Sequence, residues 1–215
     1  MFEQFRCFSN LTAEHFDQLR AISEPVSVQK GTIVFAPGDE SRGFYAVSSG
    51  AVRLYRVSPG GREITLAIAD GGNTLAEASI FSGKYHCYAQ TLKDSTLWRI
   101  NKDGFLEILR KDARFACAWI RFLSLEVIDL RQRMEELSIK TPKARIISYI
   151  LLLSEIQNHD SVTLPAHRKS IATLLGMTHE TFYRTARELE IEGMVRFDGQ
   201  RIEIMSRTLL EQCAD

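Results

Sequence analysis

Glu180 and Arg184 are two charged residues whose spacing of four places them on one face of a helix. That helix is predicted over residues 179–192, where apolar residues recur at spacings of four and three: Phe182, Ala186 and Leu189. Arginine can donate two hydrogen bonds to guanine, and glutamate can accept one from the amino group of cytosine. The same spacing also suits an ion pair on a solvated helix face, so the neighbouring elements must decide between the two.

The segment before this helix favours base reading. Residues 168–175 have the pattern of a short helix, Gly176 supplies a tight turn, and Thr178 is a suitable N-cap for the next helix. Further on, Asp198-Gly199 between two apolar runs predicts a β-hairpin, which completes a winged helix-turn-helix. The residues predicted to contact DNA are Arg168, Lys169, Thr178, His179, Glu180, Tyr183, Arg184 and Arg187.

Charge gives the chain no general attraction to nucleic acid. There are 27 Lys and Arg against 27 Asp and Glu, and from Lys140 onward ten basic residues face ten acidic ones. Affinity must therefore come from a few phosphate contacts, for which Arg168, Lys169 and Arg187 are the candidates, and binding without dimerisation should be weak.

A long helix is predicted from Asp112 to Ser138. Its apolar residues alternate in spacing between three and four, which is the a/d seam of a coiled coil: Ala113, Ala116, Ile120, Leu123, Val127, Leu130, Met134 and Leu137. A helix that packs only on its own domain can also show such a stripe. A second apolar face at Trp119, Phe122 and Leu125 can pack on that domain and leave the seam for a second copy, which favours a homodimer.

The N-terminal part is rich in glycine and in β-forming residues. Nine of the 13 glycines fall between Gly31 and Gly83, and turn sequences such as Pro37-Gly38-Asp39 separate short segments. Strands are predicted at 32–35, 44–47, 51–57, 64–68, 85–92 and 96–100. In the cleanest of them, Ile64 and Leu66 lie on one face and Thr65 on the other. This pattern predicts a compact β-roll.

The whole chain is therefore predicted to be an α+β protein of three parts. They are a double-stranded β-roll over residues 1–111, a dimerisation helix over 112–138 and a winged helix-turn-helix over 139–215. The hinge is expected at 139–141, because Thr141-Pro142 has the pattern of an N-cap followed by a first-turn proline.

This order of elements resembles the Crp/Fnr superfamily of bacterial regulators over essentially the whole chain. The matching motifs are the glycine-spaced roll, the cassette from Gly72 through Glu77 to Phe81, and the segment Glu180–Arg184. The resemblance implies a cyclic-nucleotide-binding-like jelly roll for the N-terminal domain. It also implies that Glu180 and Arg184 read a half-site core containing G·C pairs. His179 stands where members that sense cyclic AMP have arginine, which puts the neighbouring base contact in doubt.

The effector cassette departs from the members that bind cyclic nucleotides. Those members use Gly-Glu to hold the ribose and Arg-Ser to hold the cyclic phosphate. This chain keeps Glu77 but has Ala76 before it, and His86-Cys87 replaces Arg-Ser. Losing the arginine removes the forked donor that a phosphate needs, which argues against a cyclic nucleotide. The effector is expected between the roll and the long helix, near Asn73, Glu77, Tyr85, His86, Cys87, Phe122 and Glu126.

The run Asn73 to Ala78 is similar to that of the dissimilatory nitrate respiration and HcpR-type regulators, which are associated with nitric oxide sensing through haem. This resemblance implies a haem b cofactor, with His15 and His86 as candidate ligands and Met134 or Cys87 behind them. Only Cys7 lies near the N-terminus, which argues against the iron–sulfur cluster of oxygen-sensing members. A non-haem small molecule or a cyclic nucleotide remains an alternative effector.

Other function classes have less support. No P-loop, G-x-S-x-G or H-E-x-x-H motif is present, so the chain is not expected to be an enzyme. Four scattered cysteines and the lack of a signal peptide or long apolar span predict a cytoplasmic protein without membrane contact. A ligand-binding module that controls a protein partner is the remaining alternative. The expected partners are a second copy, palindromic double-stranded DNA and RNA polymerase.

Overall fold

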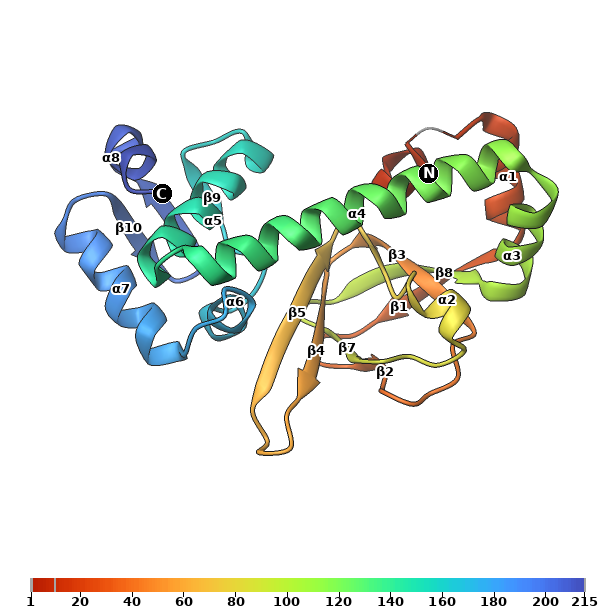
Figure 1. The fold of residues 1–215 in the computed structure, drawn as a ribbon, viewed down its shortest axis with the longest axis horizontal. Helices are drawn as coiled ribbons and strands as arrows, with labels where there is room; N and C mark the ends of the chain where they lie inside the picture. The colour runs from red at the N-terminus through yellow and green to blue at the C-terminus, as the bar shows by residue number, and fades with distance from the viewer. Residues whose placement is uncertain (1, 10, 215) are drawn as a thin grey trace. The chain divides into compact units, whose positions relative to one another are not determined.

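The computed structural model describes residues 2–9 and 11–214, which form two compact units (Figure 1). Unit 1 contains the chain up to Val57 together with Leu66–Ile128. Unit 2 contains Ser58–Thr65 and the chain from Asp129 onward. The long helix α4 (Ala113–Ile139) contributes to both units, and each unit is described by itself.

Unit 1 is built on two antiparallel four-stranded sheets, which confirms the predicted β-roll. One sheet has the order β1-β8-β3-β6 and the other β2-β7-β4-β5. The strands are β1 (Ser23–Val28), β2 (Ile33–Phe35), β3 (Gly43–Ser49), β4 (Ala51–Val57), β5 (Glu63–Asp70), β6 (Thr74–Leu75), β7 (Tyr88–Thr91) and β8 (Ser95–Asn101). The helices are α1 (Ala13–Ala21), α2 (Ser79–Ser82) and α3 (Lys102–Lys111), preceded by the 3-10 turns η1 (Phe2–Gln4) and η2 (Arg6–Phe8).

Two of these strands, β1 and β6, were not predicted from the sequence. β1 carries Pro25 and is an edge strand of its sheet, where a residue without an N–H can be tolerated. β6 has only two residues, too few to show alternation. In β5 the predicted alternation is present, but the face with Ile64 and Leu66 is exposed while Thr65 is buried.

Aromatic side chains fill the core of unit 1. Phe44 and Trp119 each contact Phe105, with ring centroids 4.9 and 4.7 Å apart. The buried rings at the N-terminus, Phe2, Phe5 and Phe8, belong to the same core. Trp119 therefore anchors α4 to the roll, as predicted. Leu125 does not continue this inner face, because it is 53% exposed.

The side of α4 that carries the predicted seam is largely uncovered. Between 45% and 68% of each of five seam side chains is exposed: Ile120, Val127, Leu130, Met134 and Leu137. Leu123 differs, because it packs against the aromatic core. The helix ends at Ile139, one residue beyond the predicted end.

Unit 2 contains the predicted helix-turn-helix and a small antiparallel sheet of order β10-β11-β9. Its helices are α5 (Pro142–Gln157), α6 (Arg168–Leu174), α7 (His179–Ile191) and α8 (Arg207–Gln212), and its strands are β9 (Ser161–Thr163), β10 (Val195–Asp198) and β11 (Arg201–Ile204). Thr141 caps α5 as predicted, since its hydroxyl accepts the backbone N–H of Ala144. The hairpin turn was predicted one residue too early. Asp198 pairs with Arg201, so Gly199 and Gln200 make the turn.

Candidate functional site

Helix α7 separates a buried face from an exposed one, as the sequence predicts. Its inner face consists of Phe182, Thr185, Ala186 and Leu189, all buried. The outer face carries His179, Glu180, Tyr183, Arg184 and Arg187, all exposed. Thr178 starts the helix by accepting the backbone N–H of Thr181 at 3.2 Å. The polar residues predicted to reach bases thus share the open face of one helix, beginning at its first turn.

Glu180 is held in its charged form by the start of α7. Hydrogen bonds from its own backbone N–H and from the Thr178 hydroxyl lower the pKa of the Glu180 carboxyl below its usual value. Among the described residues, no ion pair joins Glu180 to Arg184. The solvated ion pair left open by the spacing is therefore absent, and the Arg184 guanidinium is available to another acceptor.

The turn between α6 and α7 is fixed against the rest of unit 2. Gly176 has a φ of +65°, and a Cβ there would lie 2.7 Å from Cδ2 of Leu137 and 3.0 Å from Nη1 of Arg145. The same Arg145 Nη1 donates a hydrogen bond to the Leu175 carbonyl at 2.7 Å. Glycine is required both by the left-handed backbone and by this close approach. The crossing of the two helices is fixed accordingly.

Arg168 and Lys169, both predicted phosphate contacts, have different surroundings. Nε of Arg168 donates to the carbonyl of Gly199 in the hairpin turn at 2.9 Å. Its guanidinium lies over the rings of Tyr183 and Phe197, with Cζ 5.6 and 5.0 Å from the centroids. Lys169 is exposed. The contact of Arg168 with the hairpin gave no signal in the local sequence pattern, because 31 residues separate the two partners.

Around Glu77, unit 1 holds a cluster of buried and half-buried polar groups. Oε2 of Glu77 is buried without a hydrogen-bond partner among the described residues. Burial first and the charge of Glu126 on α4 next raise the pKa of the Glu77 carboxyl. The Cys7 thiol lies close by, hydrogen-bonded to the Thr74 side chain, and burial together with the Glu77 charge raises its pKa. Glu77 thus lies within electrostatic range of Glu126, the other glutamate predicted for the effector site, and Cys7 and Thr74 are neighbours that the sequence did not suggest.

The backbone just before Glu77 is strained. Ala76 has a φ of +70°, in the left-handed region that favours glycine. This is the position where the family pattern has glycine, so the alanine keeps the backbone shape at an energetic cost. The carboxyl of Glu77 therefore follows a bend imposed by the fold.

The other predicted effector residues divide between structure and surface. Tyr85 is a core residue, since its hydroxyl donates to the Gly43 carbonyl at 2.8 Å and its ring stacks on Phe35. The Asn73 amide donates to Oδ1 of Asp70 at 2.7 Å. Phe122 is half-buried, with its ring 5.3 Å from that of Trp119. Tyr85 and Asn73 are predicted to contact the effector, but in this structure their polar groups hydrogen-bond to neighbouring residues of unit 1.

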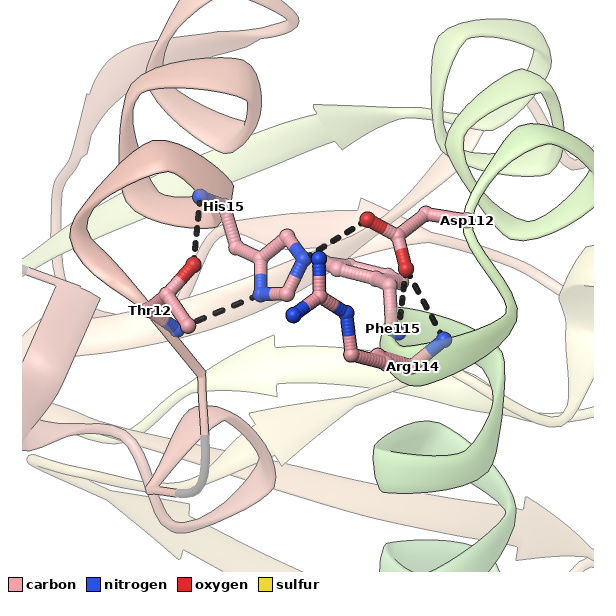
Figure 2. A network of polar contacts seen from close by, with 5 residues as sticks. All are labelled: Thr12, His15, Asp112, Arg114 and Phe115. Carbon is pink, nitrogen blue, oxygen red and sulfur yellow. Dashed lines mark hydrogen bonds and ion pairs between the residues drawn. The ribbon is translucent and has the colours of Figure 1, made fainter.

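His15 has both ring nitrogens engaged within unit 1 (Figure 2). Its Nε2 lies 2.9 Å from Oδ2 of Asp112, and its Nδ1 accepts the backbone N–H of Thr12 at 3.2 Å. The ring also contacts Phe115 edge-on. A haem iron would need one of those nitrogens, so His15 does not fit an axial ligand in this arrangement.

The remaining candidate ligands do not form a cluster. Cys87 is buried, and burial raises the pKa of its thiol, whereas iron binds a thiolate. His86 is exposed, with Nδ1 3.4 Å from the Ser79 hydroxyl, and Met134 is 68% exposed. In the part of the chain that the structure describes, no group of three or more His, Cys, Asp or Glu could hold a metal ion. His86 alone keeps the exposure and the second ring nitrogen that a haem ligand needs.

Comparison with known proteins matches both units to family models. Residues 25–112 match the cyclic nucleotide-binding domain, and residues 144–213 match the Crp-like helix-turn-helix domain. Among the described residues, none of the helices is long and apolar enough to span a membrane.

Individual proteins match along nearly the full chain. The cyclic AMP receptor protein of Thermus thermophilus is 27% identical and covers 96% of this chain and 95% of its own length. The structure of DNR from Pseudomonas aeruginosa is 31% identical, with a TM-score of 0.54, and covers 99% of this chain and 96% of that one. FixK2 from Bradyrhizobium japonicum shares the fold, with a TM-score of 0.81 at 22% identity over 90% of this chain and 98% of that one.

The two family models thus match the β-roll domain and the helix-turn-helix, α4 lies between the two matched ranges in the chain, and α7 presents its polar face to solvent. The chain belongs to the Crp/Fnr superfamily, whose members are DNA-binding transcription regulators with an effector-binding domain and are not enzymes.

Proposed function

We propose that this regulator binds palindromic double-stranded DNA as a homodimer, with one copy of α7 in each of two successive major grooves. The observation that carries the proposal is that the chain exposes both a polar helix face and an apolar helix face. α7 exposes Glu180 and Arg184, and α4 exposes five apolar seam residues. Burying each large aliphatic side chain against a second copy contributes about 1–2 kcal/mol. The resulting symmetry matches two half-sites about 34 Å apart.

Effector control follows from the placement of the polar cluster beside α4. An effector that contacts Glu77 and Glu126 would shift α4 in register or angle, and the hinge at 139–141 would carry the change to α7. Such an effector must bind the DNA-competent state more tightly than the other state, or it switches nothing. RNA polymerase is the proposed protein partner of the DNA-bound dimer.

The proposed base contacts can be tested with a DNA sequence selected from a random pool by the purified protein. Arg184→Ala should lower affinity for that sequence by about 1–3 kcal/mol and relax the preference at one base pair of each half-site, with affinity for random DNA little changed. Arg187→Ala is the matched control one turn along α7. As a phosphate contact, it should weaken specific and random binding equally. If Arg184→Ala binds both DNAs as the wild type does, Arg184 does not read bases.

For the effector we propose haem carrying nitric oxide, with His86 as the residue that would hold the haem iron. The support is the likeness to DNR, the resemblance of the 73–78 run, and the exposed imidazole of His86. A bound haem would supply an iron centre that binds the gas. His86 would be the residue of this chain that holds the haem.

An absorption spectrum of the protein reconstituted with haem tests this proposal. A stoichiometric Soret band that moves on adding nitric oxide is expected in the wild type and should be lost in His86→Ala. His15→Gln is the control, since His15 is engaged with Asp112 and Thr12 and should leave the band in place. A flat spectrum would exclude haem and return the cluster around Glu77 to a non-haem small molecule or a cyclic nucleotide.

A protein-binding module without DNA contact is the competing function. It is opposed by the exposed polar face of α7, which such a module does not require. If no palindrome can be selected from a random pool under any condition, this alternative replaces the proposal.

A further inference from the structure

We infer that Arg168 is a positioning residue that fixes the tip of the β10–β11 hairpin to the recognition helix, so that the two meet DNA as one body. The inference rests on the proposed DNA binding and assigns Arg168 a role beyond the phosphate contact that the sequence predicts for it. Its basis is a set of contacts that Arg168 makes with two separate elements of unit 2.

Arg168 joins α7 and the hairpin through three contacts. Nε donates to the Gly199 carbonyl at the hairpin tip at 2.9 Å. On the β10 side the guanidinium lies over the Phe197 ring, and on the α7 side over the Tyr183 ring. A planar guanidinium can stack on rings and donate from its edge at the same time, whereas the ammonium group of lysine cannot do both.

Without Arg168 the tip of the hairpin would have few ties to α7. Phe197, two residues before the turn glycine, is held by α7 directly, because Oε1 of Glu190 accepts its backbone N–H at 2.8 Å. The tip itself turns at Gly199, with a φ of +56° and no atom near its missing Cβ. The other turn residue, Gln200, is held from outside α7, because its carbonyl accepts the backbone N–H of Leu164 at 2.8 Å. The hydrogen bond from Arg168 adds a tie at Gly199 that leads to Tyr183 on α7.

Arg168 also fixes a side chain on the reading face. Tyr183 is 43% exposed, and its ring is contacted by His179 edge-on at 4.5 Å as well as by the Arg168 guanidinium. The orientation of this ring on α7 is therefore tied to the hairpin. Because specificity requires side chains held in a defined geometry, the loss of Arg168 should reduce the discrimination between sequences more than the overall affinity.

Three variants separate positioning from simple charge, measured as affinity for the selected palindrome and for random DNA across a range of salt. Arg168→Lys keeps the charge and loses the stacking and the Nε bond. It should lower the ratio of specific to random affinity about tenfold, with the salt slope unchanged. Phe197→Leu should act in the same direction, because it removes one stacking partner and no charge. Lys169→Gln, the neighbouring exposed cation, should weaken both DNAs equally and reduce the slope by about 2 for a dimer.

The outcome that overturns the inference is an Arg168→Lys variant that matches the wild type in both specificity ratio and slope, together with Arg168→Gln behaving as Lys169→Gln does. Arg168 would then be a phosphate contact only. Thermal unfolding of each variant verifies that unit 2 stays folded. If the wild type and Lys169→Gln also ignore the palindrome, the proposed function fails, which is a different result from failure at Arg168.

Discussion

At the scale of single residues, Asp112 performs two tasks at the start of α4. Its Oδ1 accepts the backbone N–H groups of Arg114 and Phe115, at 2.8 and 3.1 Å, which caps the helix. Its Oδ2 accepts a hydrogen bond from His15 on α1 (Figure 2). These bonds, that from His15 foremost, lower the pKa of the Asp112 carboxyl from 3.8 to about 2.

This shift predicts a defined pH dependence for Asp112→Asn. Because the folded pKa lies below the unfolded one, the charged carboxylate stabilises unit 1 above about pH 4 and loses this contribution as the pH falls towards 2. The stability difference between wild type and variant, measured by urea unfolding, should be largest near pH 7 and shrink between pH 4 and 2. Asp103→Asn, an exposed carboxylate in α3, is the control. A difference that stays constant down to pH 2 would contradict the assignment.

Ala76 offers a second prediction at this scale. Its left-handed backbone costs about 1 kcal/mol for any residue with a Cβ, so Ala76→Gly should stabilise unit 1 by about that amount. Ala78→Gly, two residues on in a right-handed conformation, should instead destabilise it by about 0.5–1 kcal/mol. The free energy of unfolding in urea measures both. A lower stability of Ala76→Gly would show that the bend is not strained.

At the scale of elements, the helices and turns that could be predicted are those set by residues close together in the chain. The helix-turn-helix depends on Gly176, the Thr178 cap and apolar residues at helical spacing, all close together in the chain, and each was found in place. The long helix was predicted to within a residue of its end for the same reason. Short elements such as β6 and β9 carry too few residues for any period to appear.

Contacts between segments far apart in the chain could not be predicted from local residue spacing. His15 pairs with Asp112 across 97 residues, and nothing near either residue indicates the other, so the sequence left His15 among the candidate haem ligands. The hydrogen bond of Arg168 to Gly199 and the approach of Cys7 to Glu77 are of the same kind. Base-contact candidates could be predicted because they sit on one helix face. The proposed effector site draws on three or more segments, and its buried neighbours Cys7 and Thr74 could not be predicted from local spacing.

The turn of the helix-turn-helix gives the prediction for this scale. Gly176→Ala adds a Cβ to a left-handed backbone and places it 2.7 Å from Cδ2 of Leu137, so unit 2 should lose about 2–4 kcal/mol. Gly193→Ala has a similar φ of +70° but nothing within 4 Å, and should cost only the backbone strain of about 1–2 kcal/mol. Urea unfolding of both variants isolates the cost of crowding. Equal losses would mean that Leu137 moves aside freely.

At the scale of the whole molecule, the exposed seam of α4 is the proposed dimer interface. Leu130 is 55% exposed in a single copy, so Leu130→Glu should leave the chain folded while placing a charge in the proposed dimer interface. Sedimentation should show the wild type as a dimer and the variant as a monomer, with affinity for palindromic DNA reduced at least tenfold. Arg131→Glu alters the adjacent exposed position outside the seam and should remain dimeric. A dimeric Leu130→Glu variant would move the interface away from α4.

Leu137 closes the apolar row of α4 and also lies against Gly176 in the turn that precedes α7. The Leu137 side chain therefore contacts the turn of the helix-turn-helix and also belongs to the proposed dimer interface. A lineage of such regulators could change its choice of dimer partner at the earlier positions of the row with little effect on which operator it recognises. At Leu137, dimer pairing and operator recognition would have to change together. A larger or smaller side chain there also changes the packing around Gly176.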